Sequence, residues 1–517
     1  MKKNGVLAEN AITKLFLAMA VILFFGLCYY SLFYSYIEVD YFEEELEVFR
    51  DNWIANTSFL VVIICLAAFL FLAQERITDK ACNILLAVTM ISMMAVGLYW
   101  ISCHAWEPQA DQSSINLVAH MVSQNDYCSF ASRWGYGATF QHQWGLILLL
   151  EIIYRILPNA DYRVFIYLNW CMVPVITYSG YYICKKISSG SKAVKIMYLI
   201  AIVLCVPLYG YIPYVYGEMI SIALIIASAA LLFSILDEFS AWKVIVFSVM
   251  TGISVQIRQT ALIYVVALLI VLIVLLVCRI DWKVLLLLGV SVISLWGCHM
   301  IVRNRYEPYL PEECDALPLS VTIAMGLHDT PDGPGWCDGS NAAVFAWESD
   351  GDAEVATEIA KADIVNRIQV FKENPTFAMD FFRRKITSQW NAPMYQAFGM
   401  NHNNIQEAEG LVPVLYYGTG KTLVEGFMNI YQLLTYVGVL SFLIFGLKRG
   451  MKFVHCLSLI IIFGGFLFSI IYEAKARYIL PYFILMIPYA VAGIELIVIR
   501  GIAMMGEIRR KQQQKNS

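Results

Sequence analysis

Residues 259–303 read QTALIYVVALLIVLIVLLVCRIDWKVLLLLGVSVISLWGCHMIVR, in which two apolar runs are separated only by a short charged turn. Each run is about 20 residues long, and a helix rising about 1.5 Å per residue needs that length to cross a hydrocarbon layer of about 30 Å. The charged turn holds Arg279, Asp281 and Lys283. This stretch therefore predicts two consecutive membrane-spanning helices.

The composition of the whole chain extends this prediction. Of its 517 residues, 59% are hydrophobic and 15% are charged, and the mean hydropathy is +0.64. A water-soluble domain does not reach such values. The net charge of −4 provides no basic surface for nucleic acid. We therefore expect a protein whose main surroundings are a lipid bilayer, with no nucleic-acid partner.

Apolar runs of similar length recur along the chain and predict twelve spans. They lie near 13–36, 55–75, 82–104, 163–184, 194–211, 216–236, 242–257, 259–279, 284–303, 425–446, 453–472 and 477–498. The first run follows Met1 closely, but it is too long for a signal-peptide core and lacks a small-residue cleavage site. We read it as an uncleaved first helix.

A thirteenth apolar run, residues 142–157, is shorter and carries Glu151 and Arg155. If it does not cross the membrane, all the basic clusters fall on one side, which the positive-inside rule makes the cytoplasm. These clusters are Lys2-Lys3, Arg76/Lys80, Lys185-Lys186/Lys192/Lys195, Arg279/Lys283, Lys448/Arg449/Lys452 and Arg509-Arg510-Lys511. We therefore expect 142–157 to be a juxtamembrane or re-entrant helix on the outer face of a plasma (inner) membrane, with both termini cytoplasmic.

The expected fold class is an all-α polytopic membrane protein with about 12 transmembrane helices, a juxtamembrane helix and a mainly helical extracytoplasmic cap. The predicted division is a two-span addition at 1–81, a core at 82–303 with its outer loop at 105–141, a cap at 304–424, a three-span part at 425–498 and a basic cytoplasmic tail at 499–517. Within the cap, 376–390 is predicted to be a basic amphipathic helix in the headgroup plane. Cys314 and Cys337 share a polar loop in which a disulfide could form.

The outer loop after the third span supplies the first candidate for chemistry. It contains the sequence Glu107-Pro108-Gln109-Ala110-Asp111. A carboxylate held at the membrane surface is suited to take a proton from an acceptor hydroxyl. The alternative is that Asp111 is one of the solvated carboxylates common in such loops.

The loop at 135–145 is dense in glycine and aromatic residues and contains Tyr136 and His142. Such a surface could stack on a sugar or position a lipid headgroup. Aromatic residues also gather at membrane interfaces because they are amphipathic, so both readings stand at this point.

Charged residues at the outer ends of spans are more informative, because charge near hydrocarbon is costly and usually faces a cavity or a partner. Glu218 opens the sixth span, Arg258 interrupts an apolar run, and Glu473 and Arg477 flank the last outer turn. Two arginines at a membrane portal suit a lipid-linked phosphate. The alternative is an ion pair, Arg258–Glu218 or Arg477–Glu473, that only braces the bundle.

Three elements of this sequence resemble the GT-C glycosyltransferases, particularly the branch related to protein mannosyltransferases and lipid A aminoarabinose transferases. They are Pro108-x-x-Asp111 after a span, His142-Gln143-x-Gly145-Leu146 after a Tyr- and Gly-rich approach, and Glu473-x-x-x-Arg477-Tyr478-x-x-Pro481. The resemblance covers roughly residues 82–498. The chain departs from the family in having Gln141 where a proline usually precedes the His-Gln pair. It also has two extra spans before the outer loop.

The resemblance implies an inverting transfer of a sugar from a polyprenyl-phosphate donor to an extracytoplasmic glycan, lipid or protein acceptor. By position, Asp111 would be the base, and Arg258 and Arg477 would bind the donor phosphate. Glu218, His142, Tyr136 and Tyr478 would complete the substrate site. No metal-ligand cluster has recognisable spacing, although Asp111 with Glu218 could bind a divalent cation. A flippase or transporter of lipid-linked sugars, and a polysaccharide polymerase or ligase, are the alternatives.

Overall fold

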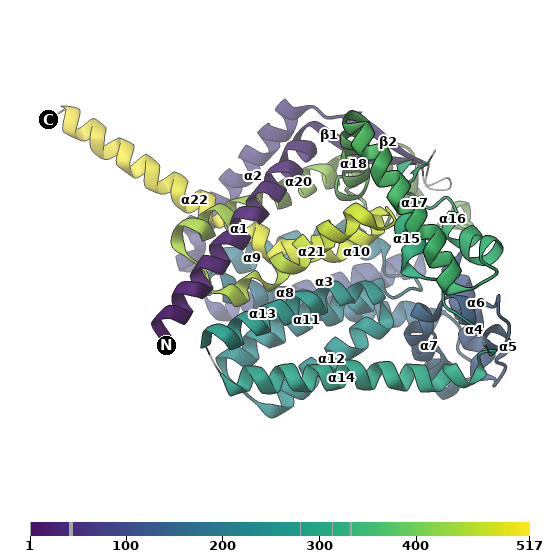
Figure 1. The fold of residues 1–517 in the computed structure, drawn as a ribbon. Coiled ribbons are helices and arrows are strands. Elements are labelled where there is room, and N and C mark those ends of the chain that lie inside the picture. The colour runs from purple at the N-terminus through teal and green to yellow at the C-terminus, as the bar shows by residue number, and fades with distance from the viewer. Residues whose placement is uncertain (1, 41–44, 280, 313, 331–332, 517) are drawn as a thin grey trace.

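The computed structural model describes residues 2–40, 45–279, 281–312, 314–330 and 333–516 of the chain, and about 79% of it is helical (Figure 1). Nine of the described helices are long and apolar enough to cross a membrane. They are α1 (Lys2–Phe33), α2 (Trp53–Ala73), α3 (Asp79–Ser102), α11 (Glu218–Asp237), α13 (Leu262–Arg279), α14 (Trp282–Tyr306), α20 (Gly418–Arg449), α21 (Leu457–Ile471) and α22 (Leu480–Asn516). The protein is therefore an all-α polytopic membrane protein, as its composition predicts.

The remaining three predicted spans coincide with helices that are shorter or less apolar. Two of them are α8 (Arg163–Ile187) and α12 (Ala241–Ile257). The third was predicted as one helix over 194–211, and this prediction is wrong. Helix α9 (Lys192–Val203) ends inside this range, and a separate helix, α10 (Val206–Gly210), follows it. The first turn of α10 contains Pro207, and the missing N–H of proline is tolerated at that position.

The long helices lie side by side, and α1 begins and α22 ends at the same end of the bundle, on the left in Figure 1. We call this the tail end. The opposite end, called the cap end, carries the helices between α14 and α20 and the loop after α3. It also carries a hairpin that the sequence did not predict, made of the antiparallel strands β1 (Tyr34–Asp40) and β2 (Glu45–Arg50). The tail at 499–516 continues α22; the side chains of Arg509 to Lys511 lie outside the described residues, as do those of Lys2, Lys3 and Arg279.

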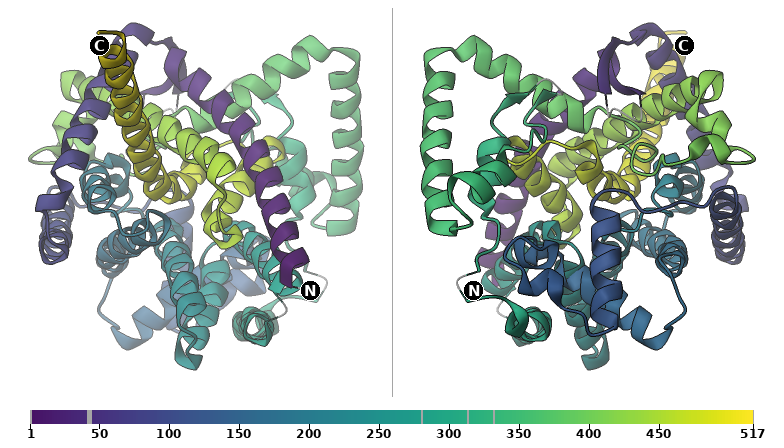
Figure 2. Two further views of the ribbon diagram at one scale, coloured as in Figure 1. Left: turned by 90° about the vertical axis from the view of Figure 1, so that its left-hand side faces the viewer. Right: turned by 90° about the vertical axis from the view of Figure 1, so that its right-hand side faces the viewer.

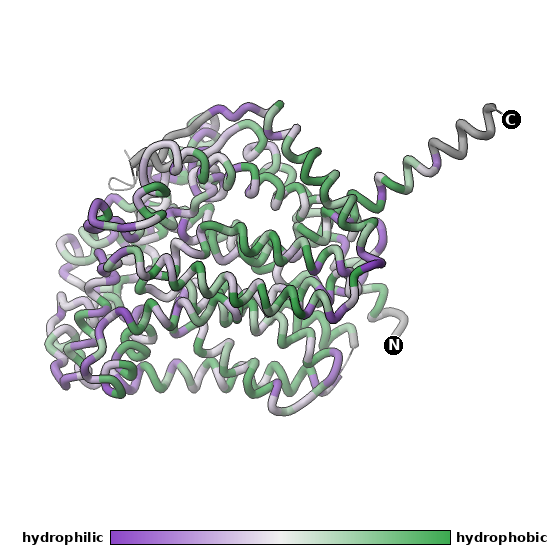
Figure 3. Tube along the Cα trace, turned by 180° about the vertical axis from the view of Figure 1, so that it is seen from behind, coloured by the Kyte–Doolittle hydropathy of each residue, from purple (hydrophilic) through white to green (hydrophobic). Residues whose placement is uncertain are grey.

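Burial separates the centre of the bundle from its periphery. The most apolar windows of α11 and α22 are 72% and 83% buried, whereas those of α2 and α14 are 11% and 17% buried. Figure 3 shows hydrophobic residues along the helices and hydrophilic residues towards their ends. Because hydrocarbon cannot satisfy backbone groups, the peripheral helices can face lipid only with their hydrogen bonds closed internally.

The segment 142–157 forms the short helices η2 (Gln141–Gln143) and α7 (Trp144–Ile156) at the cap end. With 13 residues, α7 is about 20 Å long, too short to cross the membrane. Its Glu151 is buried and accepts hydrogen bonds from Arg155 Nε at 2.7 Å, from the Tyr306 hydroxyl at 2.7 Å and from Arg305. These charged groups bind one another instead of facing lipid, which agrees with a juxtamembrane helix.

The predicted cap contains α15 (Leu319–Met325), two short strands, β3 (Asp329–Thr330) and β4 (Gly333–Pro334), and the helices α16 (Ser340–Ala343), α17 (Ala353–Glu373), α18 (Pro375–Trp390) and α19 (Val412–Tyr416). Its first part has a small hydrophobic core of its own and stands out from the bundle in Figure 2. The second part differs, because residues 387–401 are all buried and contribute Trp390, Tyr395 and Phe398 to the main core. The segment 304–424 therefore consists of an outlying subdomain and a chain that runs back into the bundle.

The segment 376–390 was expected to form a basic amphipathic helix that can lie in the headgroup plane, and part of this helix packs inside the protein. Residues Pro375–Trp390 are helical, but the side chains of Phe381 and Lys385 are fully buried in protein. Lys385 Nζ donates a hydrogen bond to the carbonyl oxygen of Gly326. Cys314 and Cys337 are both free thiols, so the structure contains no disulfide between them.

Candidate functional site

Asp111 begins helix α4 (Asp111–Ser123) at the cap end of the molecule. The preceding residue, Ala110, has φ 46° and ψ −126°, a conformation that is costly for any residue with a Cβ atom. The backbone is fixed by Gln112, whose side chain donates to the Met400 carbonyl at 3.0 Å and accepts from the Val215 N–H at 2.8 Å. An exposed carboxylate is thus presented on strained but firmly held backbone at a helix N-terminus, where negative charge is favoured.

Tyr216 connects Asp111 to both predicted arginines. The Tyr216 hydroxyl lies 3.5 Å from Asp111 Oδ2 and accepts a hydrogen bond of 2.6 Å from Gln143. The Cζ atoms of Arg258 and Arg477 lie 4.7 and 5.9 Å from the centre of the same ring, within the range of cation–π attraction. One phenol ring therefore carries the carboxylate at its oxygen and two positive charges beside its ring.

The position of Arg258 follows from a break between α12 and α13. Arg258 is extended, with φ −149°, and two glycines press against the last turn before it. A Cβ atom at Gly145 would lie 2.1 Å from the Gln256 carbonyl oxygen, and one at Gly217 would lie 2.5 Å from that of Ile257. Only glycine permits such close approach of the three segments. Gly145 of the His-Gln motif thus helps to place Arg258.

Arg258 forms one of the two ion pairs that the sequence left open. Its Nη2 lies 2.8 Å from Glu218 Oε1, and the Glu218 side chain is 3% exposed. Although this contact is short, neither carboxylate oxygen of Glu218 accepts a well-directed hydrogen bond from the described residues. The pair contributes charge balance, but its polar groups are incompletely satisfied.

Arg477 does not form the alternative pair with Glu473. The carboxylate of Glu473 instead accepts a hydrogen bond of 2.8 Å from the Tyr478 hydroxyl. Arg477 Nη1 donates to the Tyr214 hydroxyl at 2.9 Å, while its buried Nε has no partner among the residues described. This guanidinium group therefore keeps an unused donor beside Tyr216.

Tyr136 and His142 lie next to these groups. The Tyr136 hydroxyl interacts with the carboxylate of Asp111, and burial, with the nearby Tyr216 and Asp111 charges, raises the pKa of Tyr136. His142 is an exposed residue that lines the groove described below, and the protein around its ring, together with the positive charge of Arg258, lowers its pKa. Both side chains are consequently neutral at pH 7, and they offer hydrogen bonds rather than charge.

A groove of about 670 Å³ begins at His142 and runs between α7, α12, α13 and α14. Part of its wall is apolar and part is polar, and His142 and Gln259 belong to the polar part. The lining includes His142, Gln256, Gln259, His299, Arg303 and Glu307, and also Leu262, Val265, Leu295 and Val302. A second cavity, of about 20 Å³, adjoins Glu218, Arg258 and Arg477 and has room for one water molecule.

All seven residues predicted for the substrate site converge on this region. Arg258 and Arg477 lie 5.5 and 5.3 Å from the ring of Tyr478, which completes the set. Sequence reasoning missed Tyr214, Tyr216, Gln112 and Gln143. The tyrosine-rich run before Glu218 and the Gln of the His-Gln pair carried the signal for three of them.

The sequence left open whether Asp111 with Glu218 could bind a divalent cation. The structure turns Glu218 towards Arg258 instead. In the described ranges, no three or more His, Cys, Asp or Glu side chains form a group that could hold a metal ion.

Comparison of the chain with protein-family models and with curated proteins finds no match in either set.

Proposed function

We propose that this protein transfers a sugar from a polyprenyl-phosphate donor to a hydroxyl group of a cell-envelope glycan, lipid or protein, on the extracytoplasmic face and with inversion. The observation that carries the proposal is the convergence of Asp111, Arg258 and Arg477 on Tyr216. In this proposal the proton acceptor Asp111 lies at the hydroxyl of Tyr216, and the two arginines that would bind the phosphate lie 4.7 and 5.9 Å from the centre of the same ring.

In the proposed reaction, Asp111 takes the proton of the acceptor hydroxyl. At the same time, the oxygen of that hydroxyl forms a bond to the anomeric carbon. The bond from that carbon to the donor phosphate breaks, and its electron pair remains on the phosphate. Arg258 and Arg477 face this developing negative charge, which is where fixed positive charge lowers the barrier most. The unused Nε donor of Arg477 supports this role, because buried polar groups normally find partners.

The groove supports a lipid-linked donor over a soluble one. Its apolar wall of α13 and α14 residues suits a polyprenyl chain, and its polar end at His142 and Gln259 is next to Arg258. In this proposal α8, α12 and the broken helix formed by α9 and α10 also cross the membrane, which makes twelve spans with the nine long helices. The tail end, with its basic residues, is then cytoplasmic, and the cap end is extracytoplasmic.

The test is sugar transfer by the purified protein in liposomes, with a panel of radiolabelled polyprenyl-phosphate sugars. We expect Asp111→Asn to lose about 10²–10⁴-fold in turnover, the usual contribution of a general base. Glu107→Gln, an exposed carboxylate of the same loop, is the matched control and should keep full activity. If wild type consumes no donor but moves lipid-linked sugar across the bilayer, the flippase alternative replaces the proposal.

A further inference from the structure

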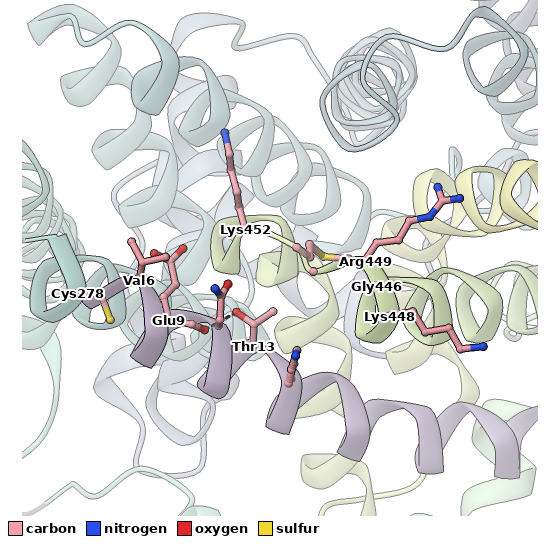
Figure 4. A pocket seen from close by; sticks show the side chains of 12 residues that line it. Val6, Glu9, Thr13, Cys278, Gly446, Lys448, Arg449 and Lys452 are labelled. Carbon is pink, nitrogen blue, oxygen red and sulfur yellow. Dashed lines mark hydrogen bonds between the residues drawn. The ribbon is translucent and has the colours of Figure 1, made fainter. Parts of the chain in front are cut away.

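A second sizeable pocket of the described chain is at the tail end, opposite the candidate site. Its volume is about 820 Å³, and it lies between the first turns of α1, the end of α13 and the turn that follows α20 (Figure 4). Four cationic side chains line it, from Lys14, Lys448, Arg449 and Lys452. No step of the proposed sugar transfer uses them.

These cations have no acidic partner. Among the residues that the structure describes, none of the four forms an ion pair or a side-chain hydrogen bond, and all four are exposed. Figure 4 shows the side chains of Lys448 and Arg449, at the end of α20, and of Lys452, in the turn that follows, pointing in different directions, with Glu9 and Thr13 on α1 across the pocket. The positive potential of these exposed side chains around one pocket favours an anion there.

One carboxylate, that of Glu9, also lines the pocket, and it already accepts a backbone hydrogen bond. Glu9 is 7% exposed, and its Oε1 accepts a hydrogen bond of 3.3 Å from the N–H of Phe453. Phe453 begins the short helix η7 (Phe453–Cys456), whose N-terminus favours a negative charge. The positive field of the rim is therefore only partly offset by Glu9.

The surroundings favour a lipid over a soluble anion. Val6 and Met451 give the pocket an apolar side. Beyond Lys14, at helical spacing on the same helix, Ile22 and Phe25 are 75% and 67% exposed and form a lipid-facing track. A headgroup among the cations would thus continue into acyl chains lying along α1.

We propose that this pocket binds the phosphate headgroup of an anionic phospholipid in the leaflet at the tail end. The basic residues at the end of α20 and in the turn after it attract the phosphate, and the exposed face of α1 receives the acyl chains. Juxtamembrane basic clusters attract anionic lipids in this way. The site is independent of the proposed transferase activity.

The experiment uses the full-length protein purified in mild detergent and incubated with equal amounts of phosphatidylglycerol and phosphatidylcholine. Bound lipid is counted by native mass spectrometry. We expect wild type to retain phosphatidylglycerol about tenfold over phosphatidylcholine, and K448Q/R449Q/K452Q to reduce this preference to about twofold or less. The charge-conserving variant K448R/R449K/K452R should keep the preference, which separates charge from folding.

The matched control, R76Q/K80Q/K185Q, removes three exposed basic residues elsewhere at the tail end and should leave the tenfold preference intact. Two outcomes would overturn the proposal: an unchanged preference in K448Q/R449Q/K452Q, or an equal loss in the control, which would indicate diffuse attraction. Glycerol 3-phosphate is the third probe. If it displaces the lipid and raises the thermal stability of wild type as much as phosphatidylglycerol does, the pocket binds a soluble phosphate instead.

Discussion

Two clusters of buried charge lie at the cap end, and they differ in how completely their groups are paired. Around Glu151, two arginines and a tyrosine hydroxyl donate to one carboxylate. Around Tyr216, the Arg477 Nε and both Glu218 oxygens have no hydrogen-bond partner in the described residues. A satisfied network rigidifies the fold, whereas an incompletely satisfied one leaves groups for a ligand. We therefore read the first cluster as a brace and the second as the binding site.

The first prediction tests the brace. Glu151→Gln should lower the free energy of unfolding by about 3 kcal/mol, because it leaves Arg305 and Arg155 without their shared carboxylate. Unfolding of the purified protein in denaturing detergent measures this, with Glu107→Gln as an exposed control. Transfer per folded molecule should stay unchanged. Loss of transfer without loss of stability would place Glu151 in the site instead.

The second prediction tests the binding site with the same type of change. Arg477→Gln should reduce sugar transfer by about 10²–10³-fold, since a positive charge beside the leaving phosphate is lost. Thermal stability should fall only modestly, because the hydrogen bond from Nη1 to Tyr214 is lost while the wild-type Nε donor is unsatisfied already. Arg163→Gln, at an exposed arginine of the cap end, is the control. An equally stable variant with normal kcat and KM would refute the assignment.

A third prediction concerns Lys385, a buried cation outside both clusters. Burial lowers the pKa of Lys385 from 10.5 to about 7. Between these values the unfolded chain holds the proton and the folded chain does not, so stability should rise with pH from about 7 to 10 and stay flat below 7. Lys385→Met should remove this rise, which amounts to about 4 kcal/mol over the roughly 3 pH units from 7 to 10.

The measurement is the melting temperature of wild type and Lys385→Met at several pH values from 6 to 10. The variant should be the more stable protein at pH 6 to 7, and the difference should shrink as the pH rises. A constant difference across this range would show that Lys385 keeps its ordinary pKa.

The smallest expected effect is at Ala110. Ala110→Gly should raise the free energy of unfolding by about 1 kcal/mol, because glycine adopts the observed φ and ψ without strain. Ala119→Gly, in the middle of the same helix α4, is the matched control and should lower it by about 1 kcal/mol. Chemical denaturation measures both. Destabilisation by Ala110→Gly would contradict the strained backbone at Asp111.

Much of the fold was predictable because hydropathy and helix length are local properties of the chain. Nine of the twelve predicted spans coincide with described helices that are long and apolar enough to cross a membrane, whereas 194–211 is broken after Val203. The hairpin β1–β2 and the burial of 387–401 were not predictable. Each depends on distant partners: Tyr36 N–H, for example, donates to the Asn391 carbonyl at 3.0 Å.

The sequence alone determined that the protein is embedded in a membrane. It also singled out the candidate residues, since the cost of burying charge makes Glu218, Arg258 and Arg477 stand out in apolar surroundings. Only the tertiary structure decided which of them pair. Arg258 meets Glu218 across 40 residues of sequence, Arg477 turns from Glu473 to Tyr214, and Glu151 is neutralised by α14. Hydropathy is a property of each segment, whereas ion pairing depends on where packing brings the segments together.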